Sequence, residues 1–295
     1  MLTHIEINGF KSFENFTITL NPFTVILGNN ASGKSNLFDA IQLLAHLANT
    51  DLHTAFKGLR GEPEYLFREL SPKHPVECMQ FAVEVLLEPF VRDPWGKQVA
   101  LTHTRIRYEL EITRIPGDKE LPRLVVTKEQ AIPILAKDDT WQPVSHKLTN
   151  SFRQHFLKYT RRVPWLETET ENGKRQFRIR QDNMAGRSRS GEAAEATVLS
   201  SITTAEFPHL YALREELRSW HLLQLDPMAL RKPSSILTED HLLPDGSNLA
   251  AVLYRIWMKT RDKTYPKGIL ADIAGALSEI IHGVVDVAVA RDDAA

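Results

Sequence analysis

One short loop carries the residues of this chain that are best suited to bind a phosphate chain. Residues 28–35 match the pattern G-x-x-x-x-G-K-[ST] at every fixed position. In such a loop the two glycines let the backbone approach a ligand closely, and successive backbone N–H groups converge on a phosphate. Lys34 supplies a positive charge for the β- and γ-phosphates, and the Ser35 hydroxyl can ligate Mg²⁺. The pattern therefore predicts binding of a purine nucleoside triphosphate, with ATP and Mg²⁺ favoured.

The segments on either side of the loop support this interpretation. Residues 23–27 form a continuous apolar run, which is typical of a strand buried on both faces at the centre of a sheet. From Lys34 onwards apolar residues recur at helical spacing, so a helix of about three turns should begin where the loop ends. Asn36 and Asp39 are expected at capping and solvated positions of this helix. The predicted nucleotide contacts are Gly28, Asn29, Asn30, Ala31, Ser32, Gly33, Lys34, Ser35 and Asn36, with Mg²⁺ on Ser35.

Apolar and polar residues alternate in several other segments, as they do in strands with one wet face. The predicted strands besides the apolar run are residues 2–8, 16–20, 79–87, 104–112 and 123–127. The last three of these are expected to form an antiparallel meander. Helical spacing returns near the end of the chain, and residues 284–290 read as a final strand.

These patterns predict three parts along the chain. Residues 1–128 are expected to join the phosphate loop to an antiparallel sub-sheet. Residues 129–205 are polar and are expected to form an irregular insertion. Residues 206–295 are expected to be helical and to return to the core of the fold.

The composition is that of a folded protein without a global charge. The 36 basic and 37 acidic residues give a formal net charge of −1, so any nucleic acid or membrane surface would have to be met by a local patch. The single cysteine, Cys78, excludes an internal disulfide, and no apolar run approaches the roughly 20 residues that span a bilayer. Because no signal-peptide pattern follows Met1, we expect a cytoplasmic location and no membrane partner.

Two stretches of the sequence resemble one known family. Residues 5–16 (IEINGFKSFENF) and 27–41 (LGNNASGKSNLFDAI) are similar to the N-terminal half of the SMC/RecF/OLD-like ABC-type ATPases, often grouped with bacterial AAA-family ATPases. The resemblance covers nearly the whole chain and is tightest at residues 3–45. It implies an α/β P-loop NTPase fold: a RecA-like, ABC-type sheet, an adjoining antiparallel β sub-sheet and a helical C-terminal part. It also implies ATP and Mg²⁺ as ligands and two heads that enclose two ATP molecules.

Several parts of that family's site are not found in this sequence. The family completes its site with a Q-loop, an L-S-x-G-like signature, an aspartate–glutamate pair after an apolar strand and a switch histidine. The nearest acidic candidates are Asp226, which Pro227 follows, and Asp292 and Asp293, where Arg291 breaks the apolar run. We interpret both as structural, so no catalytic residue is assigned and the chain resembles a head that ends before its catalytic half. Nucleotide binding is predicted, whereas turnover by this chain alone is not.

Two further residues are candidates through the resemblance. In related heads a basic residue near the start of the chain can touch phosphate, which makes Lys11 a candidate ligand. Gln80 could occupy the Q-loop, but its place inside a strand with period-two alternation favours a solvent-facing role.

Basic residues gather in one stretch of the predicted insertion, with aromatic residues between them. The basic residues are Lys158, Arg161, Arg162, Lys174, Arg175, Arg178, Arg180, Arg187 and Arg189. This composition fits a nucleic-acid patch. Four glutamates between residues 167 and 192 interrupt it, so a solvated face is the favoured interpretation.

Three functions follow from these observations. The leading one is an ATPase head that couples its nucleotide state to dimerisation through the ATP face, as a homodimer or with a heteromeric partner. DNA or an effector protein would be the further partner, in a process such as repair or phage defence. The alternative is a non-hydrolysing nucleotide-binding module, or a fragment completed in trans by another chain. A P-loop kinase is the third, and the predicted antiparallel meander counts against it.

Overall fold

A computed structural model describes residues 1–71, 74–117, 122–141, 148–181 and 184–291. The chain divides into two compact units, Met1–Trp220 and His221–Ala295. The first unit contains the sheet and the loop at residues 28–35, and the second is helical where it has regular structure. Among the described residues, no helix is both long enough and apolar enough to cross a membrane.

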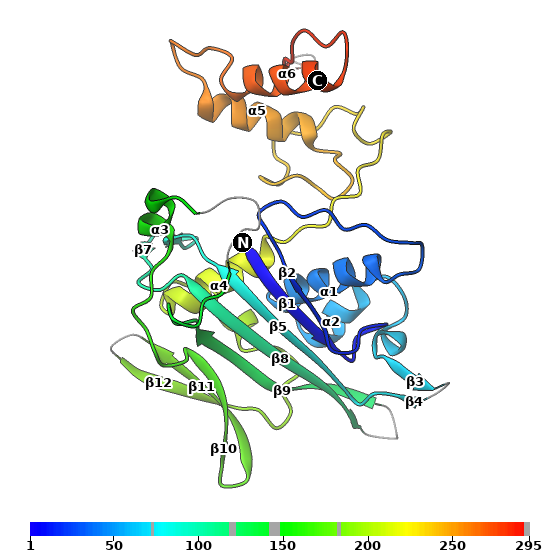
Figure 1. The fold of residues 1–295 in the computed structure, drawn as a ribbon, viewed down its shortest axis with the longest axis vertical. Coiled ribbons are helices and arrows are strands. Elements are labelled where there is room, and N and C mark those ends of the chain that lie inside the picture. The colour runs from blue at the N-terminus through cyan, green and yellow to red at the C-terminus, as the bar shows by residue number, and fades with distance from the viewer. Residues whose placement is uncertain (72–73, 118–121, 142–147, 182–183, 292–295) are drawn as a thin grey trace. The chain divides into compact units, whose positions relative to one another are not determined.

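An antiparallel sheet is the main element of the first unit (Figure 1). In spatial order its strands are β12 (Met184–Ser190), β11 (Lys174–Gln181), β10 (Leu166–Glu171), β9 (Pro122–Pro133), β8 (Arg105–Pro116), β5 (Cys78–Leu86), β1 (Leu2–Asn8) and β2 (Phe16–Thr19). All neighbouring strands in this order run antiparallel. The N-terminal hairpin therefore joins the meander through the pairing of β1 with β5.

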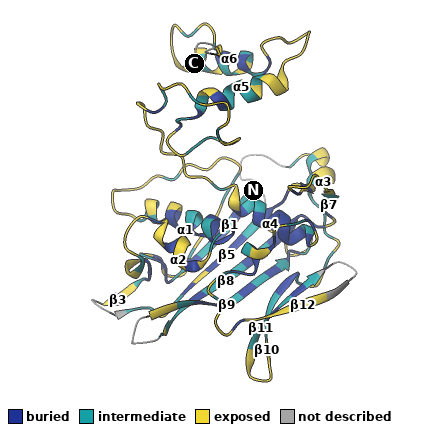
Figure 2. Cartoon of the chain, turned by 180° about the vertical axis from the view of Figure 1, so that it is seen from behind, coloured by how far each residue is buried: buried dark blue, intermediate teal, exposed yellow. Residues whose placement is uncertain are grey.

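The period-two alternation of the strands places one face of this sheet in the core. Every second residue of β1 is buried, with Ile5 and Ile7 at 1% exposure or less. Three helices cover that face, α1 (Lys34–Leu47), α2 (Leu52–Lys57) and α4 (Pro208–Arg218) (Figures 1 and 2). The apolar side of α1 packs in the same core cluster as β1, β5 and β8, so helical and strand periodicity bury matching faces.

The opposite face of the sheet is polar and carries a ladder of ion pairs. The guanidinium of Arg107 lies 2.7 Å from a carboxylate oxygen of Glu6 on β1 and 2.7 Å from one of Glu109 on its own strand. Lys128 on β9 pairs with the other oxygen of Glu109 at 2.7 Å. These pairs link β9, β8 and, across the intervening β5, β1 on the side that the helices leave open.

Smaller elements connect the sheet to the helices. They are η1 (Pro63–Leu66), β3 (Glu69–Ser71), β4 (His74–Pro75), β6 (Phe90–Arg92), β7 (Gln98–Ala100), α3 (Asn150–Phe156) and η3 (Leu199–Ser201). One buried carboxylate fastens η3 to the sheet: Glu129 on β9 accepts from the backbone N–H groups of Val198 and Leu199 at 2.6 and 3.0 Å. It also accepts from the Tyr108 hydroxyl at 3.0 Å. Burial outweighs these donors and raises the pKa of Glu129 to about 7.

The second unit is built on two helices, α5 (Leu249–Thr260) and α6 (Ile269–Ile280). Few of its side chains are fully buried, and the indole N–H of Trp257 on α5 donates to the carbonyl of Pro266, in the loop between the two helices, at 3.1 Å. The guanidinium of Arg255 donates to carbonyl oxygens of the loop before α5, including that of Ile236 at 2.6 Å. Backbone contacts, rather than a large core, hold this unit together.

The structure confirms most predicted elements, but two predicted strands are wrong. Residues 23–27 form no strand, and the side chains of Phe23, Val25 and Leu27 are 84%, 63% and 87% exposed. Ile26 points the other way and packs against the core. Residues 284–290 also form no strand. Neither segment pairs with a strand among the described residues. A strand is stable only when its backbone groups are hydrogen-bonded to a neighbour, so neither segment forms one.

Residues 129–205 are more regular than their polar composition indicates. The strand β9 continues to Pro133, and β10, β11 and β12 extend the sheet beyond it. In β11 the buried residues Phe177 and Ile179 alternate with arginines, so a period-two pattern is present beneath the charge. The division at residues 128 and 205 stays a prediction, whereas the structure divides after Trp220.

Candidate nucleotide-binding site

The loop at residues 28–35 leads directly into α1, and its glycines are required by the backbone. Gly33 is the N-cap of α1 and has a φ of 90°, a left-handed conformation that side-chain-bearing residues adopt at a steric cost. A Cβ at this position would lie 3.2 Å from Ser12 Oγ. A Cβ on Gly28 would lie 2.9 Å from Ser32 Oγ. Both glycines therefore permit the close packing of this turn.

The first turn of α1 offers backbone N–H groups to an anion. The first N–H groups of an α-helix have no acceptor inside the helix. No side chain caps this end of α1, and no acidic residue lies in its first turn. The aligned peptide dipoles add a partial positive charge at the same place. Helix N-termini that bind phosphate have this arrangement.

The side chain of Lys34 folds back over the loop. Its ammonium group donates to the carbonyl oxygens of Gly28 and Asn29, at 2.6 Å each, and lies 3.5 Å from Ser32 Oγ. The positive charge is thus held at the centre of the turn, where phosphate oxygens would be stronger acceptors than carbonyl groups. Ser35 follows in the first turn and is exposed. The residues present fit a triphosphate with a divalent cation.

The hairpin turn between β1 and β2 lies against the end of the loop. The side-chain amide of Asn36 donates to Ser12 Oγ, in this turn, at 2.9 Å. The same oxygen is the atom that a Cβ on Gly33 would meet. Ser12 therefore supports both the last glycine of the loop and the first turn of α1. Nothing in the sequence singled out Ser12, because its partner is 24 residues away. The predicted contact of Asn36 with nucleotide stays a prediction.

Asp39 is buried, so the prediction that it is solvated is wrong. Its side chain is 6% exposed, and Oδ2 accepts from Lys11 Nζ at 2.6 Å and from Arg60 Nη2 at 2.9 Å. The helical period brings Asp39 to the side of α1 that meets the β1–β2 turn, and the two cations offset the loss of hydration. Lys11 also donates to the carbonyl of Arg60 at 3.1 Å. In this structure Lys11 fastens α1 to the turn, and its contact with phosphate stays a prediction.

A comparison with protein families agrees with this geometry. The profile of the AAA domain family matches residues 4–154, a range that includes the loop, α1 and the strands from β1 to β9. The chain belongs to this family. The family implies a nucleotide as ligand of this AAA domain, and the matched range confirms the resemblance drawn from residues 5–41.

Two individual proteins are also similar to this AAA domain. The DNA replication and repair protein RecF of Crocosphaera subtropica is 42% identical over 62 residues, which are 19% of this chain and 16% of that protein. A solved SMC ATPase structure, described together with ATP-driven dimerisation and DNA-stimulated activation, is 22% identical. It covers 43% of this chain and 69% of its own, with a TM-score of 0.28. The chain therefore matches a small share of the length of RecF.

The remaining residues weighed in the sequence analysis make contacts of their own. Gln80 on β5 is exposed, as its strand pattern predicted, and donates to Glu111 at 2.8 Å. Asp226 accepts from the backbone N–H of Met228 at 2.9 Å in a turn of the second unit, which agrees with a structural role. Asp292 and Asp293 lie outside the described residues.

The arginines predicted to form a solvated face lie on both sides of the β10–β12 hairpins. Arg178 and Arg180 pair with glutamates of β10, which are Glu167 and Glu169. Arg187 lies on the other face of β12 and pairs with Glu206 at 2.6 Å. The sheet register therefore separates a stretch that is continuous in sequence into two groups.

Proposed function

We propose that this AAA domain binds Mg·ATP on residues 28–35. The observation that carries the proposal is the uncapped N-terminus of α1, which begins at a left-handed glycine inside a complete phosphate-loop pattern. Backbone N–H groups at this end would hold the β-phosphate. Lys34 would leave the carbonyls of Gly28 and Asn29 for the β- and γ-phosphate oxygens, and the Ser35 hydroxyl would ligate Mg²⁺.

Hydrolysis would require groups that this loop does not supply. A carboxylate must orient the attacking water, and further donors must stabilise charge on the γ-phosphate. We propose that these groups come from another polypeptide segment, in a dimer or heteromer that closes over the ATP face. One observation supports completion by a partner: Phe23, Val25 and Leu27 expose apolar side chains just before the loop, while Ile26 packs against the core. An extended apolar segment with one covered side and one bare side is suited to packing against a partner.

The similarity to RecF supports a proposed role in a DNA process such as repair, and phage defence is a second setting for the same chemistry. A domain that binds ATP without turnover, completed in trans, is the alternative function. The two differ in what ATP does to the assembly: the ATPase hydrolyses ATP when the site is closed, whereas the binding module only associates.

Calorimetric titration with Mg·ATP tests the binding proposal. The variant Lys34→Ala should lose at least about 100-fold in affinity, because a charge-assisted contact to two phosphates is removed. Lys57→Ala is the matched control, because Lys57 is an exposed lysine of α2 outside the phosphate-loop pattern. Equal affinities of Lys34→Ala and the unaltered chain would refute the proposed role of the loop.

Light scattering after gel filtration tests the proposed association. The chain should increase in mass with Mg·ATP and return to the lower mass with Mg·ADP, and Lys34→Ala should not respond. Steady hydrolysis near 1 s⁻¹ by a chain that stays monomeric, a rate at the low end of ordinary enzymes, would contradict the need for a partner.

A further inference from the structure

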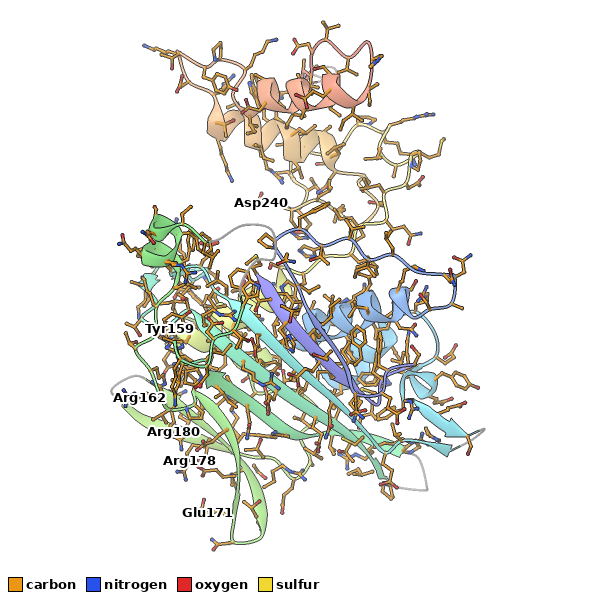
Figure 3. All side chains as sticks on the ribbon, in the orientation of Figure 1. Tyr159, Arg162, Glu171, Arg178, Arg180 and Asp240 are labelled. Carbon is orange, nitrogen blue, oxygen red and sulfur yellow. The ribbon has the colours of Figure 1, made fainter. Side chains whose placement is uncertain are left out.

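A second polar pocket lies on the β10–β12 extension. It has a volume of about 760 Å³, and its lining includes the guanidinium-bearing residues Arg161, Arg162, Arg178 and Arg180. Figure 3 shows Arg162, Arg178 and Arg180 on the same side of the first unit, beside these strands. Among the described lining residues there is no carboxylate and no aromatic ring. The pocket therefore has four positive charges on its wall.

Strand register explains why these arginines gather. In β11 the side chains of Phe177 and Ile179 face the core, so Arg178 and Arg180 face the other way. Arg178 is opposite Ser188 of β12, whose small side chain also lines the pocket. Gly186 forms part of the wall, and a Cβ there would lie 2.5 Å from the carbonyl of Ile179. Small residues on β12 thus leave space beside the arginines.

The arginines are oriented by neighbours outside the pocket. Glu169 on β10 pairs with Arg178 at 3.0 Å and with Arg180 at 3.3 Å. Arg161 donates to the carbonyl of Val163 at 2.7 Å and stacks over the ring of Trp165 at 5.0 Å. Such fixed guanidinium groups lose little conformational freedom when they bind a ligand.

These contacts leave hydrogen-bonding capacity unused. A guanidinium carries five N–H donors, and a carboxylate engages two of them at most in a bidentate pair. Nη1 of Arg180 is buried and has no hydrogen-bond partner among the described residues. Arg162 is exposed and forms no ion pair with any residue that the structure describes. A buried donor without a partner costs free energy unless a ligand supplies the acceptor.

We propose that this pocket is a second anion site, which binds adjacent phosphate groups of one ligand. Among the described residues the arginines outnumber the two glutamates beside them on β10, Glu167 and Glu169, and this excess of positive charge suits a ligand with more than one negative charge. Planar guanidinium groups bind phosphate oxygens in pairs. Because no aromatic ring lines the pocket, it recognises phosphates rather than bases. A nucleic-acid backbone and a small polyphosphate share this chemistry. The proposal does not depend on ATP binding at residues 28–35.

Binding of two probes to a pocket variant and a matched control tests the proposal. The pocket variant is Arg162→Gln/Arg178→Gln. The control, Arg187→Gln/Arg189→Gln, removes the same charge from β12 residues that lie opposite Phe177 and Ile179 and so face away from the pocket. The probes are inorganic tripolyphosphate, followed by calorimetry, and a fluorescein-labelled 12-nucleotide single strand, followed by anisotropy. All chains also carry Lys34→Ala, which removes the other phosphate site.

The affinity of the pocket variant for at least one probe should fall by about tenfold or more. The affinity of the control should fall by less than about threefold. With the oligonucleotide, the salt dependence of log K should fall by about 1.4, for two lost cations on a single strand. Loss for the oligonucleotide alone identifies a strand as the ligand, and loss for tripolyphosphate alone identifies a small anion. Arg162→Lys/Arg178→Lys should restore part of the affinity, which separates lost charge from misfolding. Equal losses in pocket and control variants, or no binding of either probe at low salt, would overturn the proposal.

Discussion

Asp39 offers the sharpest test of how the phosphate loop is supported. The substitution Asp39→Asn keeps the size of the side chain and one oxygen acceptor but removes the negative charge. Lys11 Nζ, whose side chain is 13% exposed, then loses its 2.6 Å ion pair. Arg60 loses its pair as well, but its side chain is 64% exposed and water can replace the carboxylate. The cost of the substitution should therefore come mainly from Lys11.

The size of that cost follows from the burial of the two partners. Removal of one partner from a buried ion pair destabilises proteins by about 3–5 kcal/mol, because an uncompensated charge stays buried. Lys11 keeps its hydrogen bond to the carbonyl of Arg60, and Asn keeps one acceptor, so we expect the low end, about 3 kcal/mol. For a unit of roughly this size, each kcal/mol changes Tm by about 2–4 °C. The fall in Tm should be about 6–12 °C.

Circular dichroism during heating measures this fall in Tm. Two further variants show whether it comes from the ion pair. Asp138→Asn is the matched control, because Asp138 is exposed and its side chain takes part in no ion pair among the described residues. Lys11→Met/Asp39→Leu should recover most of the loss, because the unpaired charge is gone and apolar side chains fill the space. A Tm of Asp39→Asn within 2 °C of the unaltered chain would refute the inference that Asp39 neutralises Lys11. A fall in Tm for Lys11→Met/Asp39→Leu as large as that for Asp39→Asn, or larger, would refute it as well.

Three further predictions follow. Burial raises the pKa of Glu129 from 4.5 to about 7, so the folded chain keeps a proton that the unfolded chain releases. The free energy of unfolding should therefore fall by about 3 kcal/mol as pH rises from 4.5 to 7. Urea denaturation at several pH values measures this fall, and it should be largely absent in Glu129→Gln. The same pH dependence of the unfolding free energy in both chains would contradict the prediction. Val25→Ser/Leu27→Ser should leave the Tm of the chain unchanged but prevent association with Mg·ATP in light scattering, and an intact response would exclude this face. Burial raises the pKa of the Cys78 thiol to about 11, so iodoacetamide at pH 8 should alkylate it far more slowly than free cysteine, and an equal rate would contradict this.

The sequence was sufficient for those features that depend on neighbouring residues. The start of α1 at Lys34 and the alternation in β1, β5 and β8 were readable, because hydrophobic periodicity within one segment decides both. The strand β11 was missed although Phe177 and Ile179 alternate with charged residues, because the polar composition around them suggested irregular structure. In this case the period of two was the better guide, and the density of charge was misleading.

Features that depend on distant residues could not be predicted. Ser12 supports Gly33 and Asn36 only because the turn between β1 and β2 folds over the start of α1. The local sequence predicts a solvated Asp39, because it holds no sign of the ion pair with Lys11, which lies 28 residues earlier. A charged residue on a helix is usually solvated unless a partner neutralises it. That partner becomes visible only in the tertiary structure.

The failure of the predicted strand at residues 23–27 has a different cause, and it bears on function. The apolar run has the composition of a strand, but composition alone does not pair its backbone donors and acceptors, and no strand forms there. Ile26 packs against the core, while the side chain of Leu27, immediately before Gly28, is 87% exposed. The proposed phosphate contacts all come from consecutive residues of one turn and one helix, so they need no neighbouring strand. A site for hydrolysis needs groups from other segments, and we propose that a partner packs on the exposed apolar side chains of residues 23–27 to supply them. In the proposed function, binding and turnover therefore depend on different parts of the assembly, and the light-scattering experiment with Val25→Ser/Leu27→Ser separates them.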